Sequence, residues 1–161
     1  DNLDYHRDME QYYLAKKLLF SEHIDKNGAA IINVDDPYGR RIISELNDAK
    51  FISYGFAEDA DYRITEFKGA ADGSNFVINR GTSSYKISSN LPGRHNASNI
   101  TACFCVAKML GINSRDIIKT IKHGIYIPGR LEKFTLKNGA AAYVDYAHTD
   151  DALEKVLKTL R

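Results

Sequence analysis

Apolar positions recur along the chain with two different spacings, and these spacings predict alternating helices and strands. A spacing of three and four residues predicts a first helix from about Asp8 to Ile24. A short β-rich run, AAIINV at 29–34, follows it, and YGRRIISEL then predicts a helix with Pro37 in its first turn. A second short strand, KFISYGF, comes next. Strand, helix and strand at this spacing predict a βαβ unit with parallel strands.

The character of the pattern changes in the middle of the chain. Residues 61–90 hold three β-rich stretches separated by Gly, Asp, Asn and Ser, which predict a small antiparallel meander. Two helices are predicted after it, over 95–111 and 114–123. EKFTLK and AAAYVDY then flank an Asn-Gly hairpin signal, and a last helix is predicted from about Thr149. The predicted fold class is therefore α/β, with a mostly parallel sheet and a small antiparallel β subsheet.

A domain boundary is predicted near residue 130. The composition shifts there, after the Pro-Gly pair of IPGR at 127–130. The first domain would span 1–130 and the second would start with 131–161. About 30 residues cannot bury a core of their own, so we expect 131–161 to be the opening of a further domain. The chain also begins without a Met, which favours a piece of a longer protein.

Composition narrows the classes of function. The 161 residues carry a formal net charge of +1, which gives no electrostatic footprint for nucleic acid or an anionic membrane. No apolar run approaches the roughly 20 residues that span a bilayer, and the first residues, DNLDYHRDMEQYY, are polar. Cys103 and Cys105 form neither a disulfide framework nor a CxxC site. We therefore expect a cytoplasmic protein with no nucleic-acid or membrane partner.

A lysine interrupts the apolar face predicted for the first helix. The helical wheel puts Lys16 at the centre of that face and Lys17 toward its edge. The apolar members of the face are Met9, Tyr12, Tyr13, Leu19 and Phe20. One interpretation is a snorkelling side chain whose stem packs while its ammonium reaches water. The other is a partly buried lysine that reacts as a free amine with carbon dioxide, which turns a cation into a metal-binding carbamate.

Two amides stand in the first turn of the helix predicted over 95–111. Asn96 and Asn99 share one face with an otherwise apolar stripe. Asparagine is a favoured N-cap residue and one of the two could serve as the cap, but capping does not need both. Two inward amides beside a helix N-terminus could instead recognise the donor and acceptor edge of a base.

Three further polar residues lie near the predicted boundary. Asp145 ends a predicted strand, where α/β sheets bind ligands, and its carboxylate could accept hydrogen bonds from ribose hydroxyls. His148 follows in the loop before the last helix, where a cap by Thr149 or Asp150 is the plainer use of the segment. Arg130 is either a surface arginine or one that swings onto phosphate between two domains. The chain contains neither GxxxxGK[ST] nor GxGxxG, so these residues indicate a nucleotide site without a phosphate cradle.

Five segments keep a common order along the chain and carry a family resemblance. They are DNLDYHRDMEQYYLAKKLLF at 1–20, INVDDPYGRR at 32–41, LPGRHNASN at 91–99, PGRLEKF at 128–134 and VDYAHTDDALEKVL at 144–157. Together they resemble the Mur ligase family, and within it the MurE type. The resemblance implies the later part of a central ATPase domain, followed by the start of a Rossmann-like C-terminal domain.

The resemblance also implies an activity. Enzymes of the MurE type are ATP-dependent acid–amino-acid ligases of peptidoglycan synthesis, which work through an acyl phosphate. They add the third amino acid, a diamino acid such as lysine or diaminopimelate, to UDP-MurNAc-L-Ala-D-Glu. The implied cofactors are ATP and Mg²⁺, and we expect a monomer. Because the family's P-loop lies upstream of residue 1, the chain alone is expected to be inactive.

Roles for single residues follow from the same resemblance. Lys16 matches the family's carbamylated lysine, which acts in catalysis and holds magnesium. Asn2 stands where the family usually has a metal-binding His, and an Asn carbonyl also suits a hard cation. Arg130 matches an arginine that approaches the ATP phosphates.

The remaining matches lie on the nucleoside side. Asn96 and Asn99 match asparagines that contact adenine, and Asp145 matches an acidic residue near the ribose. His148 belongs to the same nucleotide-side motif. Where the family usually has Pro, this chain has Asp150, which a first helical turn accepts.

Two alternatives remain open. One is another Mur-like ligase, of the folylpolyglutamate or cyanophycin type, which would share the ATPase architecture. The other is a non-catalytic relative that serves as an interaction module, for which Asn2 and the absent P-loop are the support.

Overall fold

Five strands form a single mixed sheet in the order β1-β2-β3-β4-β5. Their bounds are Ala30–Asn33, Phe51–Gly55, Tyr62–Ala70, Gly73–Arg80 and Ser83–Ser89. β1, β2 and β3 are parallel, whereas β3, β4 and β5 are antiparallel. The predicted βαβ unit and meander are therefore parts of one sheet, because β3 pairs with β2 on one edge and with β4 on the other. The predicted α/β class is confirmed.

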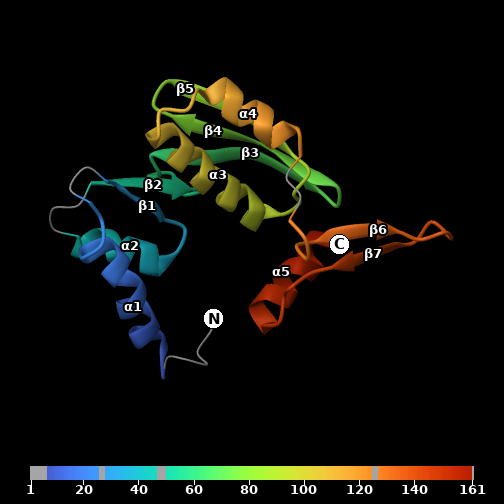
Figure 1. Ribbon diagram of the computed structural model, residues 1–161, viewed down its shortest axis with the longest axis horizontal. Coiled ribbons are helices and arrows are strands. Elements are labelled where there is room, and N and C mark those ends of the chain that lie inside the picture. Colours follow the sequence, from blue (N-terminus) through green and yellow to red (C-terminus); the bar gives the residue numbers. More distant parts are fainter. Residues whose placement is uncertain (1–6, 26–27, 47–49, 125–126, 161) are drawn as a thin grey trace.

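The computed structural model describes residues 7–25, 28–46, 50–124 and 127–160 (Figure 1). Its helices are α1 Met9–Ser21, α2 Pro37–Glu45, α3 Arg94–Met109, α4 Ser114–Lys122 and α5 Asp150–Leu160. Aspartates fix the starts of the first two helices: Asp8 accepts a hydrogen bond from the Gln11 amide, and Asp36 accepts one from the Tyr38 amide. Among the described residues, no helix is both long and apolar enough to cross a membrane.

The parallel strands are covered on both faces. Ala30 and Ile32 of β1 are buried against α1 and α2, whereas Ile31 packs toward the cluster that includes α3. This alternation follows from the two-residue period of a strand, which points successive side chains to opposite faces. α3 and α4 lie over the same face of the sheet (Figure 1). The larger core lies between these two helices and strands β3 to β5, with Phe104 of α3 at its centre.

A second, two-stranded sheet follows the predicted boundary. β6 Glu132–Thr135 pairs antiparallel with β7 Ala141–Val144, and the hairpin projects away from the five-stranded sheet (Figure 1). α5 follows β7 after a five-residue loop, 145–149. The predicted hairpin and last helix are therefore confirmed, and no described residue after 130 belongs to the larger sheet.

The face that α1 buries differs from the predicted one. Tyr13 is only 3% exposed and Phe20 packs beside it, but Leu19 is 56% exposed. Lys16 is exposed as well, so its predicted place at the centre of a buried face is wrong. The cause lies on α2, where Arg41 stacks on the Tyr13 ring at 4.1 Å and turns that side of α1 toward α2.

Candidate functional site

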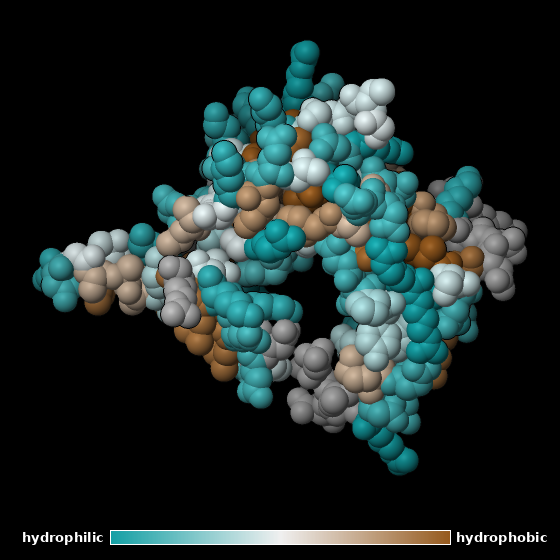
Figure 2. All heavy atoms as spheres, turned by 180° about the vertical axis from the view of Figure 1, so that it is seen from behind, coloured by the Kyte–Doolittle hydropathy of each residue, from teal (hydrophilic) through white to brown (hydrophobic). Residues whose placement is uncertain are grey.

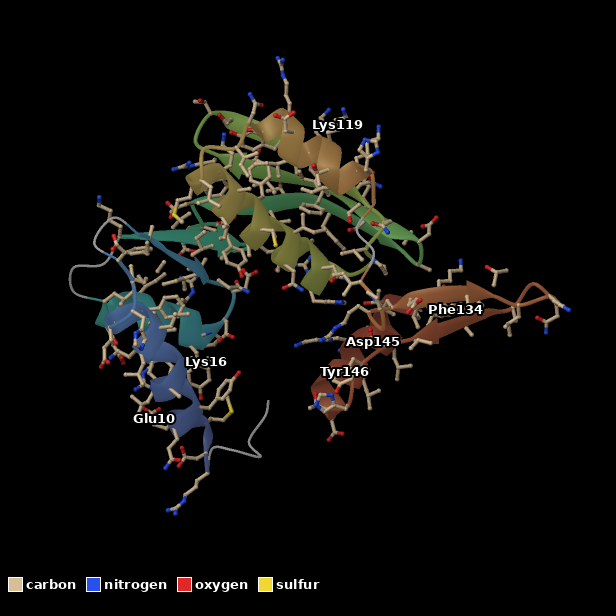
Figure 3. All side chains as sticks on the ribbon, viewed as in Figure 1. Glu10, Lys16, Lys119, Phe134, Asp145 and Tyr146 are labelled. Carbon is tan, nitrogen blue, oxygen red and sulfur yellow. The ribbon has the colours of Figure 1, made fainter. Side chains whose placement is uncertain are left out.

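A cavity of about 490 Å³ lies where the start of α3 meets the segments before β6 and after β7. It brings together all five residues predicted for the nucleotide side: Asn96, Asn99, Arg130, Asp145 and His148. Asn96 and Arg130 are more than 30 residues apart in the sequence, so only the fold could place them on one wall. Figure 3 labels Asp145 and Tyr146 beside the start of α5.

The two asparagines do not cap α3. The N-cap residue is Gly93, which makes no side-chain hydrogen bond. Asn96 instead donates its Nδ2 to the Pro92 carbonyl oxygen at 2.8 Å, which leaves its Oδ1 as an acceptor. Asn99 is exposed on the cavity wall, and its side chain makes no hydrogen bond within the described part of the chain. The capping alternative is therefore wrong, and the geometry favours amides that meet a ligand.

Asp145 follows directly on the last residue of β7, as predicted. Its two carboxylate oxygens accept different backbone amides: Oδ2 accepts from Leu131 N and Oδ1 from Ala147 N, each at 2.8 Å. A carboxylate has about four lone-pair positions, so each oxygen can still accept a further hydrogen bond. Asp145 is thus held rigidly in the cavity wall and keeps the capacity to bind a hydroxyl.

Arg130 and His148 approach the same ring from two sides. The Arg130 guanidinium lies 5.8 Å from the centre of the Tyr146 ring, and the His148 ring meets that ring edge-on at 5.5 Å. His148 Nδ1 lies 2.9 Å from the Tyr146 carbonyl oxygen. The alternative use of this loop as a cap holds for Thr149, whose hydroxyl accepts from the Ala152 amide.

Two aromatic rings of the cavity were not among the predicted site residues, although both lie within the segments that carry the family resemblance. His95 is half-buried beside Asn96, and Tyr146 follows Asp145. Burial lowers the pKa of His95 from its ordinary value, although the Asp145 carboxylate opposes the shift. The shift favours the uncharged ring, which suits contact with an aromatic base. Aromatic residues are so common in cores that neither one stood out in the sequence.

Lys16, one of the two predicted metal ligands, lies elsewhere. Lys16 belongs to α1, on the other side of the molecule's open centre from Asp145 and Tyr146 (Figure 3). Figure 2 shows that opening from behind, and the described residues around it are mostly hydrophilic. Asn2 lies outside the described residues. Within those residues, no group of three or more His, Cys, Asp or Glu side chains could hold a metal ion.

Two adjacent lysines of α1 differ in their partners. Lys17 donates to Glu45 Oε2 at 2.5 Å, whereas the Lys16 ammonium only approaches the Tyr12 ring at 5.4 Å. Lys16 has no carboxylate partner within the described residues. As an ammonium it would repel Mg²⁺, whereas a carbamate on Nζ would offer the oxygen ligands that this ion prefers. Lys16 therefore fits the predicted metal site only in its carbamylated form.

Glu45 of α2 accepts three hydrogen bonds: two join it to α1, from Lys17 and from the Tyr13 hydroxyl, and one comes from Arg41 Nε within α2. These donors, Lys17 first, lower the pKa of Glu45 to about 2 from its ordinary 4.5. A carboxylate with a lowered pKa stabilises the fold above its unfolded pKa, and that contribution disappears as the pH falls through the folded value. We therefore expect Glu45 to contribute stability above about pH 4.5 and to lose it between about pH 4.5 and 2.

This expectation is measured by urea unfolding across that pH range. The Glu45→Gln variant should lose stability at neutral pH and show a shallower decline with acid than the unmodified chain. Glu58→Gln is the matched control, because Glu58 is 90% exposed and its one ion pair among the described residues is with Arg63. Equal pH profiles for Glu45→Gln and the unmodified chain would contradict the expectation.

Comparison with known proteins places this geometry in a family. The Mur ligase middle domain matches residues 1–107. A diaminopimelate ligase of UDP-N-acetylmuramoyl-L-alanyl-D-glutamate from Geobacter sulfurreducens is 42% identical over 99% of the chain, which covers 32% of that relative. The corresponding ligase of Neisseria meningitidis serogroup B is 38% identical over 100% of the chain and 33% of the relative. The chain thus spans about a third of the length of these curated relatives.

Solved structures agree on the fold. A MurF from Acinetobacter baumannii superposes with a TM-score of 0.87 over 98% of the chain and 34% of that structure, at 23% identity. A UDP-N-acetylmuramoyl-L-alanyl-D-glutamate–2,6-diaminopimelate ligase superposes with a TM-score of 0.77, at 31% identity over 99% of the chain and 33% of that structure. The match over residues 1–107 covers well over half of the sequence. The chain therefore belongs to the Mur ligase family.

Proposed function

We propose that this chain is part of a longer, ATP- and Mg²⁺-dependent ligase of the MurE type. The ligase would add a diamino acid to UDP-MurNAc-L-Ala-D-Glu in peptidoglycan synthesis. The main support is the single cavity that gathers all five nucleotide-side residues. Curated relatives that are 34–42% identical over the whole chain carry the name of diaminopimelate ligases, which favours diaminopimelate over lysine.

The division of the chain is part of this proposal. Residues 1–130 would be the later part of the central ATP-binding domain, and 131–161 would open the C-terminal domain. The change from the five-stranded sheet to the β6-β7 hairpin supports that division. Because the substrates are a nucleotide sugar and ATP, we place the enzyme in the cytoplasm. We also propose that it is a monomer.

The five nucleotide-side residues would contact different parts of ATP. ATP supplies the phosphoryl group that activates the substrate carboxylate. Asn96 and Asn99 present amide donors and acceptors to the edge of adenine, while Asp145 faces the ribose. Arg130 has no ion pair among the described residues, so its guanidinium is available to the phosphates. His148, held by the Tyr146 carbonyl, stays on the nucleotide side.

Lys16 would complete the metal site from the opposite side of the opening. Its unprotonated amine attacks carbon dioxide, so that a bond forms between Nζ and carbon. One electron pair of a C=O bond moves to oxygen, and a proton leaves Nζ for water. The resulting carbamate anion would bind Mg²⁺, together with the side-chain carbonyl of Asn2.

The activity is tested in the full-length protein. ATP, UDP-MurNAc-L-Ala-D-Glu and diaminopimelate should together give phosphate and a product heavier by one diamino acid residue. Omission of the dipeptide substrate is the control for simple ATP hydrolysis. Glutamate addition to a folate would point to the folylpolyglutamate type, and the absence of any ligation would support the interaction module. Both of those outcomes overturn the proposal.

Base recognition by Asn99 gives a separate prediction. Because the Asn99 side chain makes no hydrogen bond among the described residues, Asn99→Ala should leave the free energy of unfolding nearly unchanged. The affinity for ATP should fall about tenfold, since a hydrogen bond to the ligand is lost. Calorimetric titration of the full-length protein with ATP and with inosine triphosphate measures both affinity and base preference.

Asn96→Ala is the matched comparison. It removes the same group but also the hydrogen bond to Pro92, so it should lower both stability and affinity. An Asn99→Ala variant that keeps its preference for ATP over inosine triphosphate would exclude Asn99 from base recognition.

A further inference from the structure

The segment that leads into β6 adopts an unusual backbone conformation. Gly129 has φ +68° and Leu131 has φ +47°, both in the left-handed region. Glycine adopts this region freely, but a leucine there carries a cost, because its Cβ crowds the following carbonyl oxygen. Leu131 is also 7% exposed, so its side chain is buried against its surroundings. Such a residue keeps its conformation only where neighbouring groups hold it in place.

The groups that hold it come from the other end of the hairpin. Asp145 Oδ2 accepts the Leu131 amide at 2.8 Å, and the Tyr146 amide donates to the Gly129 carbonyl oxygen at 2.9 Å. Asp145 Oδ1 accepts the Ala147 amide, which fixes the carboxylate itself. The single carboxylate of Asp145 therefore ties the segment before β6 to the loop after β7.

We propose that Asp145 is a positioning residue that holds Leu131 in its left-handed conformation and so directs Arg130 into the cavity. The inference rests on the proposed function, since Arg130 is the residue whose placement it explains. Arg130 lies directly before Leu131, and its guanidinium lies beside the Tyr146 ring. If Leu131 relaxed to an extended conformation, the chain direction at Arg130 would change and the guanidinium would leave the cavity wall.

This role differs from the ribose contact that the family resemblance implies. A ribose ligand acts through the hydroxyls of the nucleotide, whereas a positioning residue acts through the backbone of its own chain. The two roles can be distinguished when a substitution of Asp145 is combined with a nucleotide that lacks the ribose hydroxyls.

The decisive experiment combines Asp145→Asn with two nucleotides in the full-length ligase. An asparagine has the shape of aspartate, but its Nδ2 must face one of the two backbone donors, so one hydrogen bond is lost. We expect kcat/KM to fall by roughly tenfold with 2′,3′-dideoxy-ATP, which lacks both hydroxyls, and by at least as much with ATP, where the ribose contact is weakened as well. An effect seen with ATP alone would assign Asp145 to the ribose and overturn the proposal.

Leu131→Gly provides a second, independent variant. Glycine adopts the left-handed conformation without support from neighbouring groups. The Asp145→Asn substitution should therefore lower kcat/KM by a factor about fivefold smaller in the Leu131→Gly background than in the unmodified protein. The same cost in both backgrounds would mean that Asp145 does not act through Leu131.

The hydrogen bond between the Leu131 amide and the Asp145 carboxylate can also be tested without an activity measurement. The Leu131 amide should be protected from hydrogen exchange in the unmodified protein and exchange at least about tenfold faster in Asp145→Ala, which removes both acceptor oxygens. Unchanged protection would overturn the proposal. A full-length protein that shows this protection but ligates no substrate would refute the proposed function. The role of Asp145 in holding Leu131 would still be supported.

Discussion

Replacement of Phe104 by alanine is expected to lower the free energy of unfolding by about 3–5 kcal/mol. The Phe104 side chain is fully buried, and its ring lies 4.9 Å from the Tyr85 ring and 6.2 Å from the Tyr62 ring, measured between centroids. Removal of the ring leaves a cavity between α3 and the sheet, which the surrounding side chains can only partly fill. Chemical denaturation of the two proteins measures the difference.

Val106→Ala is the control for this substitution. Val106 lies on the same helix but is 41% exposed, so its truncation should cost less than about 1 kcal/mol. Similar losses in the two variants would show that α3 does not pack through Phe104. The result also bears on function, because the first two turns of α3 carry the two asparagines of the cavity.

Replacement of Lys16 by arginine should reduce ligase activity of the full-length protein by about a hundredfold or more. Arginine keeps the positive charge, but it is never deprotonated in proteins, so it cannot react with carbon dioxide. The proposed metal ligand is then replaced by a cation. Besides activity, mass spectrometry after chemical trapping of the carbamate should detect labelled carbon dioxide on Lys16 only in the unmodified protein.

The neighbouring lysine supplies a matched control. Lys17→Arg preserves a cation opposite Glu45 and should change activity little. Equal losses in the two variants would mean that α1 contributes structure alone. Full activity of Lys16→Arg would exclude the carbamate from catalysis.

Local periodicity was sufficient to predict the helices, the strands and the antiparallel meander of β3 to β5. It gave no information on how the meander joins the βαβ unit, because the sequence does not reveal that β3 pairs with a parallel and an antiparallel neighbour. The buried face of α1 was predicted wrongly for a related reason. The wheel counts apolar residues of one helix, whereas the orientation of α1 depends on Arg41 and Glu45 of α2.

The residues of the candidate site could be predicted from the segments that resemble the Mur ligase family, but not from their spacing along the sequence. Nothing in the residues between Asn99 and Asp145 indicates that these two side chains share a cavity. The hydrogen bond from the Leu131 amide to Asp145 was also beyond prediction, since it accompanies the positive φ of Leu131. A leucine gives no sequence signal for that conformation, which glycine or asparagine normally adopts.

The division of β1 between two cores has a consequence for the order in which the molecule comes apart. Among the described residues, the cluster under α1 and α2 contains four buried residues, whereas the cluster under α3 and α4 contains twelve. Partial unfolding of the sheet starts where the least apolar surface is lost, so of these two layers the α1 layer is the weaker cooperative unit. Lys16 thus belongs to the layer that opens at the lower free energy of the two. The access of a small reactant such as carbon dioxide to Lys16 is then coupled to the stability of that layer, and less to the stability of the whole chain.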